Sequence, residues 1–201
     1  RTFRAAGASA WSRCLYQTAY RLTGMEHFTL RRATAVTCAY EFPARHARWA
    51  GSPRVEVIYN RVDIDRFKPL AGEPGQPLRV LTVGNHIPGK EPSAIIGAVR
   101  DLPVELTVVG KGPLTSRLQA LVRDLGIENK VRFVKAVPNA SIHEYYQSHD
   151  LFCISIRYPG VCIPVLEAMA SGLPIVTNQP LWESAPEVVG DRAEIESVSY
   201  T

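Results

Sequence analysis

Lys90 lies in a sequence context suited to binding phosphate. It ends a glycine-rich loop that begins at Gly84 and directly follows an apolar run. A lysine in such a loop can bind phosphate through charge-assisted hydrogen bonds, each contributing about 1.5–3 kcal/mol. It can equally be a solvated surface lysine, which is the commoner fate of that residue type. The loop therefore indicates either a phosphate site or an ordinary exposed turn.

A second candidate is Glu167, which stands among apolar residues of a short helix expected over residues 164–171. Pro164 suits a first helical position, where its missing N–H costs nothing, and Gly172 suits the left-handed residue that ends a helix. The N-terminus of such a helix has unpaired N–H groups and partial positive charge, which favour phosphate. The segment thus supplies a possible anion site and a nearby carboxylate.

The carboxylate of Glu167 has two interpretations. An acid in the first turn of a helix is favourable to the helix dipole and can simply be solvated. Alternatively, a carboxylate can accept two hydrogen bonds from a vicinal diol such as that of ribose. Composition alone favours the solvated side chain.

The elements that must position these residues alternate regularly from residue 78 onward. Apolar runs predict strands at residues 78–83, 105–109, 131–134, 151–155 and 174–177, and the segments between them predict helices at residues 93–100, 114–125, 141–148 and 164–171. This alternation predicts an α/β fold with a doubly wound parallel sheet, Rossmann-like in type. Because such sheets bind ligands beyond the carboxyl ends of their strands, the site is expected in the loops that follow the strands.

The segment before residue 70 is less regular. Helical spacing is expected over residues 11–22, ended by Gly24, and again over residues 41–50, with short strands at 33–38 and 55–59. A stretch rich in glycine and proline then runs to Pro77, which is typical of a linker. This part predicts an incomplete α/β segment joined to the regular one.

Charge is unevenly distributed along the 201 residues. The net charge is +4, yet residues 1–54 contain nine arginines against two glutamates. A basic segment of this kind can face an anionic membrane, bind nucleic acid or form a solvated helix surface. Because base-stacking aromatic residues are not interleaved with the arginines, we expect no nucleic acid and retain the other two interpretations.

Other classes of function have little support. No Ser-His-Asp arrangement, metal-ligand cluster or Walker loop is present, and the four cysteines show no zinc spacing. No run is long enough to span a membrane, and the start has no apolar signal segment. These features predict a cytoplasmic protein with reduced thiols and no metal site.

The stretch around Glu167 resembles the donor-binding signature of retaining glycosyltransferases of the GT-B fold, family 4. The matching residues are Gly160, Ile163, Pro164, Leu166, Glu167, Ala168, Met169, Ala170, Gly172 and Pro174. Pro159, Val161 and Cys162 stand where the family has glutamate, an aromatic residue and glycine. In the family the second glutamate of the signature holds the nucleotide ribose, so the resemblance implies that role for Glu167. The sugar contact of the first glutamate does not carry over to position 159.

Three other stretches share the resemblance. Residues 84–90 resemble the loop whose arginine and lysine hold the donor diphosphate; Lys90 matches, while Asn85 replaces the arginine and removes one charge. Residues 131–138 resemble the stretch whose backbone pairs with the nucleotide base, which implies contacts from Ala136 and Val137. Residues 108–113 resemble a turn that borders the donor site, although close packing of the turn also explains a lone Gly-x-Gly.

Residues 60–69 resemble the passage between the two GT-B domains. The resemblance therefore implies that residues 1–69 are a remnant of the acceptor-side domain with the crossing, and that residues 70–201 form the nucleotide-sugar domain.

The implied activity is transfer of a sugar, hexosyl or related, from a nucleotide diphosphate to an acceptor with retained configuration. No cofactor or metal is implied. Lys90 would be the catalytic cation that stabilises the leaving diphosphate. The donor contacts implied are Gly84, Asn85, Ala136, Val137, Gly160, Val161, Cys162, Ile163 and Glu167.

Alternatives stay open beside that activity. The chain holds about one of two GT-B domains, so we expect it to be inactive alone, either as a fragment or as a degenerate half. The losses at positions 85 and 159 also fit a non-catalytic nucleotide-sugar-binding or interaction subunit, and a nucleotide-sugar epimerase shares the fold. Sugar, base and acceptor are open; a lipid-linked or polysaccharide acceptor would fit peripheral membrane contact through the arginine-rich segment.

Overall fold

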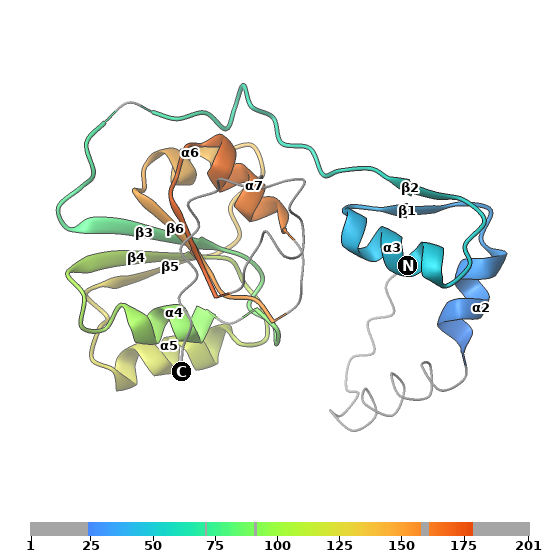
Figure 1. Ribbon diagram of the computed structural model, residues 1–201. Coiled ribbons are helices and arrows are strands. Elements are labelled where there is room, and N and C mark those ends of the chain that lie inside the picture. Colours follow the sequence, from blue (N-terminus) through green and yellow to red (C-terminus); the bar gives the residue numbers. More distant parts are fainter. Residues whose placement is uncertain (1–23, 71, 91, 158–160, 179–201) are drawn as a thin grey trace. The chain divides into compact units, whose positions relative to one another are not determined.

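The computed structural model describes residues 24–70, 72–90, 92–157 and 161–178 (Figure 1). The chain divides into two compact units, one ending at Tyr59 and the other beginning at Asn60. Each unit has its own sheet, so each is described by itself.

The second unit is built on a five-stranded parallel sheet (Figure 1). Its strands are β3 (Leu78–Val83), β4 (Val104–Val109), β5 (Val131–Val134), β6 (Leu151–Ile154) and β7 (Ile175–Thr177), in the order β5-β4-β3-β6-β7. Every neighbouring pair is parallel. The predicted doubly wound fold is confirmed, because the chain runs outward from β3 to one edge and then from β6 to the other.

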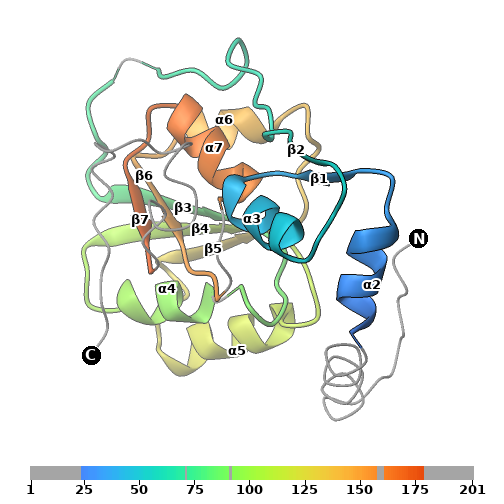
Figure 2. The same cartoon turned by 45° about the vertical axis from the view of Figure 1, so that its right-hand side comes forward.

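Helices cover both faces of this sheet (Figures 1 and 2). The helices are α4 (Pro92–Ala98) and α5 (Thr115–Asp124) on one face, and α6 (Ile142–Gln147) and α7 (Ile163–Ala170) on the other. Crossovers between parallel strands are almost always right-handed, so reversing the direction of travel along the sheet moves the helices to the opposite face. The reversal therefore occurs between β3 and β6.

A continuous hydrophobic core lies between the sheet and the first helix pair. Its buried members are Val80, Ile95, Ile96, Val99, Leu106, Val108, Leu118, Val122, Ile127 and Val131. Burying each such side chain contributes about 1.5–3 kcal/mol. This core fixes the strand ends, and hence the loops that follow them, on one rigid support.

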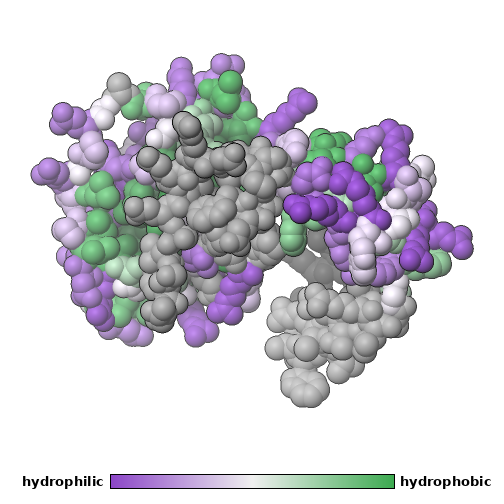
Figure 3. Space-filling model, in the orientation of Figure 1, coloured by the Kyte–Doolittle hydropathy of each residue, from purple (hydrophilic) through white to green (hydrophobic). Residues whose placement is uncertain are grey.

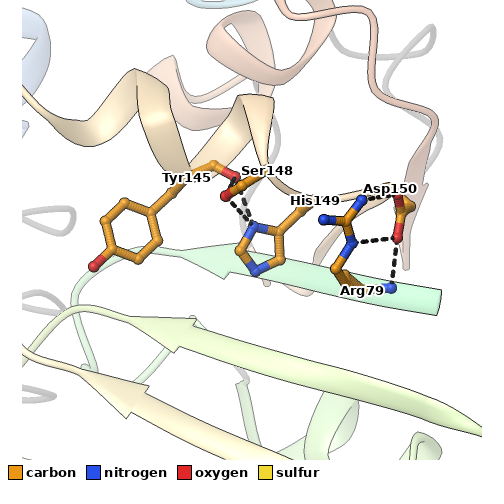
Figure 4. Close-up of polar contacts among 5 residues, drawn as sticks. All are labelled: Arg79, Tyr145, Ser148, His149 and Asp150. Carbon is orange, nitrogen blue, oxygen red and sulfur yellow. Dashed lines mark hydrogen bonds and ion pairs between the residues drawn. The ribbon is translucent and has the colours of Figure 1, made fainter. Parts of the chain in front are cut away.

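The amino ends of the central strands are held by a polar cluster (Figure 4). Asp150, directly before β6, accepts hydrogen bonds from the backbone N–H of Arg79 at 2.8 Å and from its Nη2 at 2.7 Å. The Arg79 guanidinium lowers the pKa of Asp150 to about 2. Next to it, His149 Nε2 lies 2.9 Å from the hydroxyl of Thr107, and burial lowers the pKa of that histidine. Asp150 thus joins the start of β6 to β3, and His149 joins it to β4.

The described part of the first unit, residues 24–59, contains two short parallel strands and two helices. Its elements are α2 (Met25–Arg32), β1 (Val36–Cys38), α3 (Glu41–Trp49) and β2 (Val55–Val57), and β1 pairs with β2. The helices are linked by a contact of 3.0 Å between His46 and Glu26. Gly24, which the sequence suggested as a helix end, directly precedes α2 with a φ of 64°. The helix expected at residues 11–22 lies outside the described residues.

Residues 60–69, expected to cross between domains, pack on the second unit. Phe67 is buried and contacts the ring of Tyr146 edge-on, with centroids 5.6 Å apart. The side-chain amide of Gln147 donates to the carbonyls of Arg66 and Lys68. The assignment of the two units to acceptor-side and donor domains stays a prediction.

Two further features concern the described residues only. None of their helices is both long enough and apolar enough to cross a bilayer. The cysteines among them, Cys38, Cys153 and Cys162, are free thiols.

Candidate functional site

The point where the strand order reverses marks the candidate site. β3 and β6 are neighbours, yet the chain leaves them in opposite directions, toward β4 and toward β7. In open α/β sheets, ligands bind in the crevice outside the carboxyl ends of two such strands. Here that crevice is bordered by residues 84–90 after β3 and, among the described residues after β6, by 155–157 and 161–163.

These two loops are joined directly by backbone contacts. Lys90 forms an isolated β-bridge with Ile156, and the N–H of Arg157 donates to the carbonyl of Gly89 at 2.9 Å. The side-chain amide of Asn178 forms hydrogen bonds with both backbone groups of Ile156: it accepts from the N–H at 2.9 Å and donates to the carbonyl at 3.1 Å. Segments more than 60 residues apart in sequence are thus brought together at the crevice.

Lys90 lies over the glycine that begins its loop. Its Nζ is 3.5 Å from the position that a β-carbon on Gly84 would take, so the side chain folds back across the loop. The lysine is also close enough to influence Cys162: burial raises the pKa of that thiol, and the positive charge of Lys90 acts in the opposite direction. Lys90 therefore lies against Gly84, and its charge acts on the thiol at the start of α7.

The N-terminus of α7 is open to an anion. Cys162 is the N-cap, no side chain in the described part of the chain caps the helix, and its first turn contains no acidic residue. The helix begins at Ile163, which is 48% exposed, so Pro164 is its second residue rather than its first. Val161 is fully buried, and Gly160 lies outside the described residues. With Lys90 beside it, this helix end combines a dipole and a full positive charge.

The glycines of the Gly-x-Gly turn allow two loops to touch. A β-carbon on Gly110 would lie 1.9 Å from the carbonyl oxygen of Gly84, and one on Gly112 would lie 2.3 Å from the carbonyl oxygen of His86. The N–H of His86 donates to the carbonyl of Lys111 at 3.1 Å. Close packing thus accounts for both glycines without requiring any ligand contact.

His86 is a buried, neutral side chain in the same loop. It is 1% exposed, and burial lowers its pKa. Its Nδ1 lies 2.8 Å from the hydroxyl of Thr115, which donates its own proton to the carbonyl of Gly112. Nδ1 must therefore be the donor, leaving Nε2 as a bare acceptor that has no partner among the described atoms. A neutral histidine cannot replace the positive charge missing at Asn85, which is exposed.

Glu167 is buried, contrary to the solvated interpretation. It lies beyond the first turn of α7 and is 9% exposed. Its Oε2 accepts a hydrogen bond of 2.7 Å from the hydroxyl of Tyr146 on α6. Burial raises the pKa of Glu167, and the hydrogen bond from Tyr146 partly opposes that change. The ribose role stays a prediction, now for a carboxylate whose orientation is fixed.

Tyr146 was not identified from the sequence as a site residue. The sequence suggested only that Tyr145 and Tyr146 pack α6 on the sheet, which Tyr146 does. A fully buried tyrosine usually needs a partner for its hydroxyl, but that partner is 21 residues away in sequence. No local pattern could have indicated it.

The predicted base contacts lie apart from the other site residues. Ala136 and Val137 follow β5, which β4 separates from β3. Ala136 is exposed and Val137 is half-buried. The carboxyl ends of β5, β4, β3 and β6 lie at the same edge of the sheet because these strands are parallel. Ala136 and Val137 therefore lie at that edge, beyond the 110–112 turn.

Comparison with known proteins gives one family. The model for "Glycosyl transferases group 1" matches residues 63–194. The MMP α-(1→4)-mannosyltransferase of Mycolicibacterium hassiacum is 31% identical over 152 residues, covering 73% of this chain and 36% of that protein. The GDP-mannose-dependent α-(1-6)-phosphatidylinositol monomannoside mannosyltransferase of Mycolicibacterium smegmatis is 28% identical over 162 residues, covering 70% of this chain and 42% of that protein.

A solved structure shows the same fold. Anabaena Alr3699/HepE in complex with UDP-glucose superposes with a TM-score of 0.66 at 22% identity, covering 80% of this chain and 48% of that one. The chain thus spans less than half the length of each of these three proteins.

Proposed function

Because the chain belongs to the glycosyl transferases group 1 family, of GT-B fold, we propose that it supplies the donor-binding half of a retaining, family 4 type glycosyltransferase. The donor is a nucleotide-diphosphate sugar and the group transferred is a hexosyl or related unit. The observation that carries the proposal is the contact between the loops after β3 and β6, at Lys90 and Ile156. Helix α7 follows closely, with no side-chain cap among the described residues, and it bears the buried carboxylate of Glu167.

Each group has a chemical role in the proposed transfer. When the sugar leaves, negative charge develops on the diphosphate, and preorganised positive groups stabilise it. Lys90 supplies a full charge, and the backbone at Val161, Cys162 and Ile163 supplies the helix dipole. Glu167 accepts from the ribose hydroxyls. These groups suffice for charge stabilisation without a metal or cofactor, which is why we propose none.

The relatives support a nucleotide sugar as ligand. One mannosyltransferase relative is GDP-mannose-dependent, and the Anabaena protein was crystallised with UDP-glucose. We therefore take GDP- and UDP-sugars as the donors to test first.

A thermal-shift screen tests the proposal. The melting temperature of the chain should rise with GDP-mannose or UDP-glucose, by mass action on the folded state, and should do so equally in EDTA. Free mannose and glucose should leave it unchanged. A flat response to a full panel of nucleotide sugars, or a response that requires a divalent cation, would contradict the proposal.

The first unit is proposed to provide peripheral membrane contact near a lipid-linked or polysaccharide acceptor, in the cytoplasm. Trp49 is 71% exposed and Phe28 is 62% exposed, and Arg32 lies over the Phe28 ring at 5.3 Å. Figure 3 shows hydrophilic side chains beside hydrophobic ones on this unit. Exposed aromatic residues among arginines suit an anionic interface. Several arginines are already paired within the unit, for example Arg48 with Glu41, which reduces the charge available.

A non-catalytic nucleotide-sugar-binding subunit is the second candidate. It is favoured by Asn85, which leaves Lys90 without the second cation of the family loop, and by the neutral His86 beside it. We propose further that the chain alone does not turn over, because it spans only part of its relatives and a donor must be enclosed for transfer. Sustained transfer by the purified chain would contradict this.

A further inference from the structure

The packing of the Tyr146 ring holds its hydroxyl in one position, independently of the hydrogen bond to Glu167. Tyr146 is fully buried, with its ring 5.6 Å from that of Phe67 at 72° and 5.7 Å from that of Phe152 at 35°. Phe152 belongs to β6 and Phe67 to the segment that precedes the sheet, so the ring is clamped between two parts of the unit. Its 2.7 Å hydrogen bond therefore gives the Glu167 carboxylate one preferred position.

The hydrogen bond leaves the carboxylate able to bind a diol. An ionised carboxylate has about four acceptor positions on its two oxygens, and Tyr146 occupies one of them. Oε2 is bound by the tyrosine, and Oε1 has no hydrogen-bond partner in the described part of the chain. Two ribose hydroxyls would need two acceptor positions, so the tyrosine and the ribose do not compete.

We propose that Tyr146 is a positioning residue for nucleotide binding, which holds the Glu167 carboxylate with Oε1 free to accept from the ribose hydroxyls. This rests on the proposed function, in which Glu167 binds ribose. A glutamate left to sample several rotamers would lose conformational entropy on binding, whereas one held by a clamped tyrosine is already ordered. Tyr146 would thus improve affinity without touching the ligand.

The same hydrogen bond should set the pH range of binding. Burial raises the pKa of Glu167, and the Tyr146 hydrogen bond and the charge of Arg66 lower it. The charge of Glu167 in turn raises the pKa of the Cys162 thiol, which lies at the start of the same helix. Removing the hydroxyl should therefore raise the pKa of Glu167, so that binding is lost at a higher pH as the solution is acidified.

The test compares Tyr146→Phe with Tyr145→Phe, a matched change one residue away whose hydroxyl has no such contact. Each chain is titrated by calorimetry with UDP, GDP, dUDP and dGDP between pH 5.5 and 8. We expect Tyr146→Phe to bind the better ribonucleotide about tenfold more weakly, to discriminate less against its 2′-deoxy form, and to lose affinity at a higher pH than wild type. Tyr145→Phe should match wild type in all three.

A second pair of variants covers the case in which Tyr146→Phe does not fold. Replacing both partners with apolar groups of similar shape is often nearly neutral for stability, so Tyr146→Phe/Glu167→Met should fold. Because the tyrosine acts only through the glutamate, this double variant should bind nucleotide as weakly as Glu167→Met, and no more weakly. Additive losses would overturn the inference.

The outcomes separate the two proposals. If wild type binds and discriminates against the deoxynucleotide, but Tyr146→Phe keeps the same affinity, discrimination and pH profile, the positioning role alone is wrong. If wild type binds neither UDP nor GDP, the proposed function fails and the positioning role fails with it.

Discussion

A β-carbon on Gly110 would lie 1.9 Å from the carbonyl oxygen of Gly84. The close approach joins the loop after β3 to the turn after β4, and Gly110 adopts a φ of 142° that side-chain-bearing residues rarely take. Since Lys90 folds over Gly84, the position of the proposed phosphate ligand depends on this contact. A change in the packing of the 110–112 turn should therefore also move the positive charge of Lys90 at the crevice.

Gly110→Ala should be strongly destabilising for that reason. Both the collision with Gly84 and the unfavourable φ act against alanine, and we expect a loss of about 3 kcal/mol or more in the free energy of unfolding. Urea denaturation measures it. Gly97→Ala is the control, because a β-carbon on Gly97 meets nothing within 4 Å and the residue lies in α4. That change should stabilise by about 0.5–1 kcal/mol, and equal effects of the two variants would contradict the packing argument.

Lys90 and Asn85 should change diphosphate affinity in opposite directions. Lys90→Ala removes the cation beside α7 and should weaken GDP or UDP binding about tenfold to a hundredfold, whereas Asn85→Arg should restore the second charge and strengthen it about tenfold. Calorimetry at several salt concentrations measures both, with the charged contacts weakening as salt rises.

Lys111→Ala serves as the control for these two variants, because it removes an exposed lysine from a neighbouring loop. It should change affinity little. Unaltered binding by Lys90→Ala would remove Lys90 from the site.

The ion pair of Arg79 and Asp150 should contribute to stability in a pH-dependent way. The folded pKa of Asp150 is about 2, below its ordinary value of 3.8, so its contribution is present above that ordinary value and is lost as pH falls toward 2. Asp150→Asn should cost about 1–3 kcal/mol at pH 7, with the difference from wild type shrinking between about pH 5 and pH 2. Asp101→Asn, in a pair that is largely exposed, should not change the urea midpoint. A wild-type advantage over Asp150→Asn that stays constant down to pH 2 would rule out this linkage.

The sheet could be predicted closely from the sequence. Residues 78–83 and 131–134 were expected as strands and are β3 and β5 residue for residue, because strands of a parallel sheet covered on both faces are rich in valine, leucine and other apolar residues. Helix α2 was missed: Gly24 reads as a helix end, yet a glycine with positive φ also serves before a first turn. A glycine therefore does not by itself show whether a helix ends or begins at that position.

The site was less accessible to sequence reasoning. The alternation of elements indicated that the site lies in the loops after the strands, because parallel strands end at one edge of a sheet. It did not indicate the strand order, which decides which of these loops meet. Composition gave the wrong environment for Glu167, since the partner of its carboxylate, Tyr146, lies on α6, a helix 21 residues away in sequence. The unpaired Nε2 of His86 likewise depends on a hydroxyl 29 residues away. Contacts across elements need the fold to be known first.

Membrane contact by the first unit should be salt-sensitive and require anionic lipid. Each basic residue near such a surface contributes about 1 kcal/mol, so Arg32→Glu/Arg45→Glu should reduce co-sedimentation with vesicles containing phosphatidylserine. Arg117→Glu/Arg123→Glu applies the same charge change to exposed positions on α5 and should leave binding intact. Equal recovery with neutral and anionic vesicles would leave the arginines as a solvated surface.

Calorimetric titration of the wild-type chain and of Glu167→Gln with GDP and UDP tests the central claim most directly. Glutamine keeps an acceptor for the hydroxyl of Tyr146, which alanine would leave buried and unpaired at a cost of about 1–3 kcal/mol. We predict that wild type binds one of the two nucleotides and that Glu167→Gln binds it about tenfold more weakly with an unchanged melting temperature. Glu144→Gln, at an exposed position on α6, should bind as wild type does. Equal affinity of wild type and Glu167→Gln would contradict the central claim.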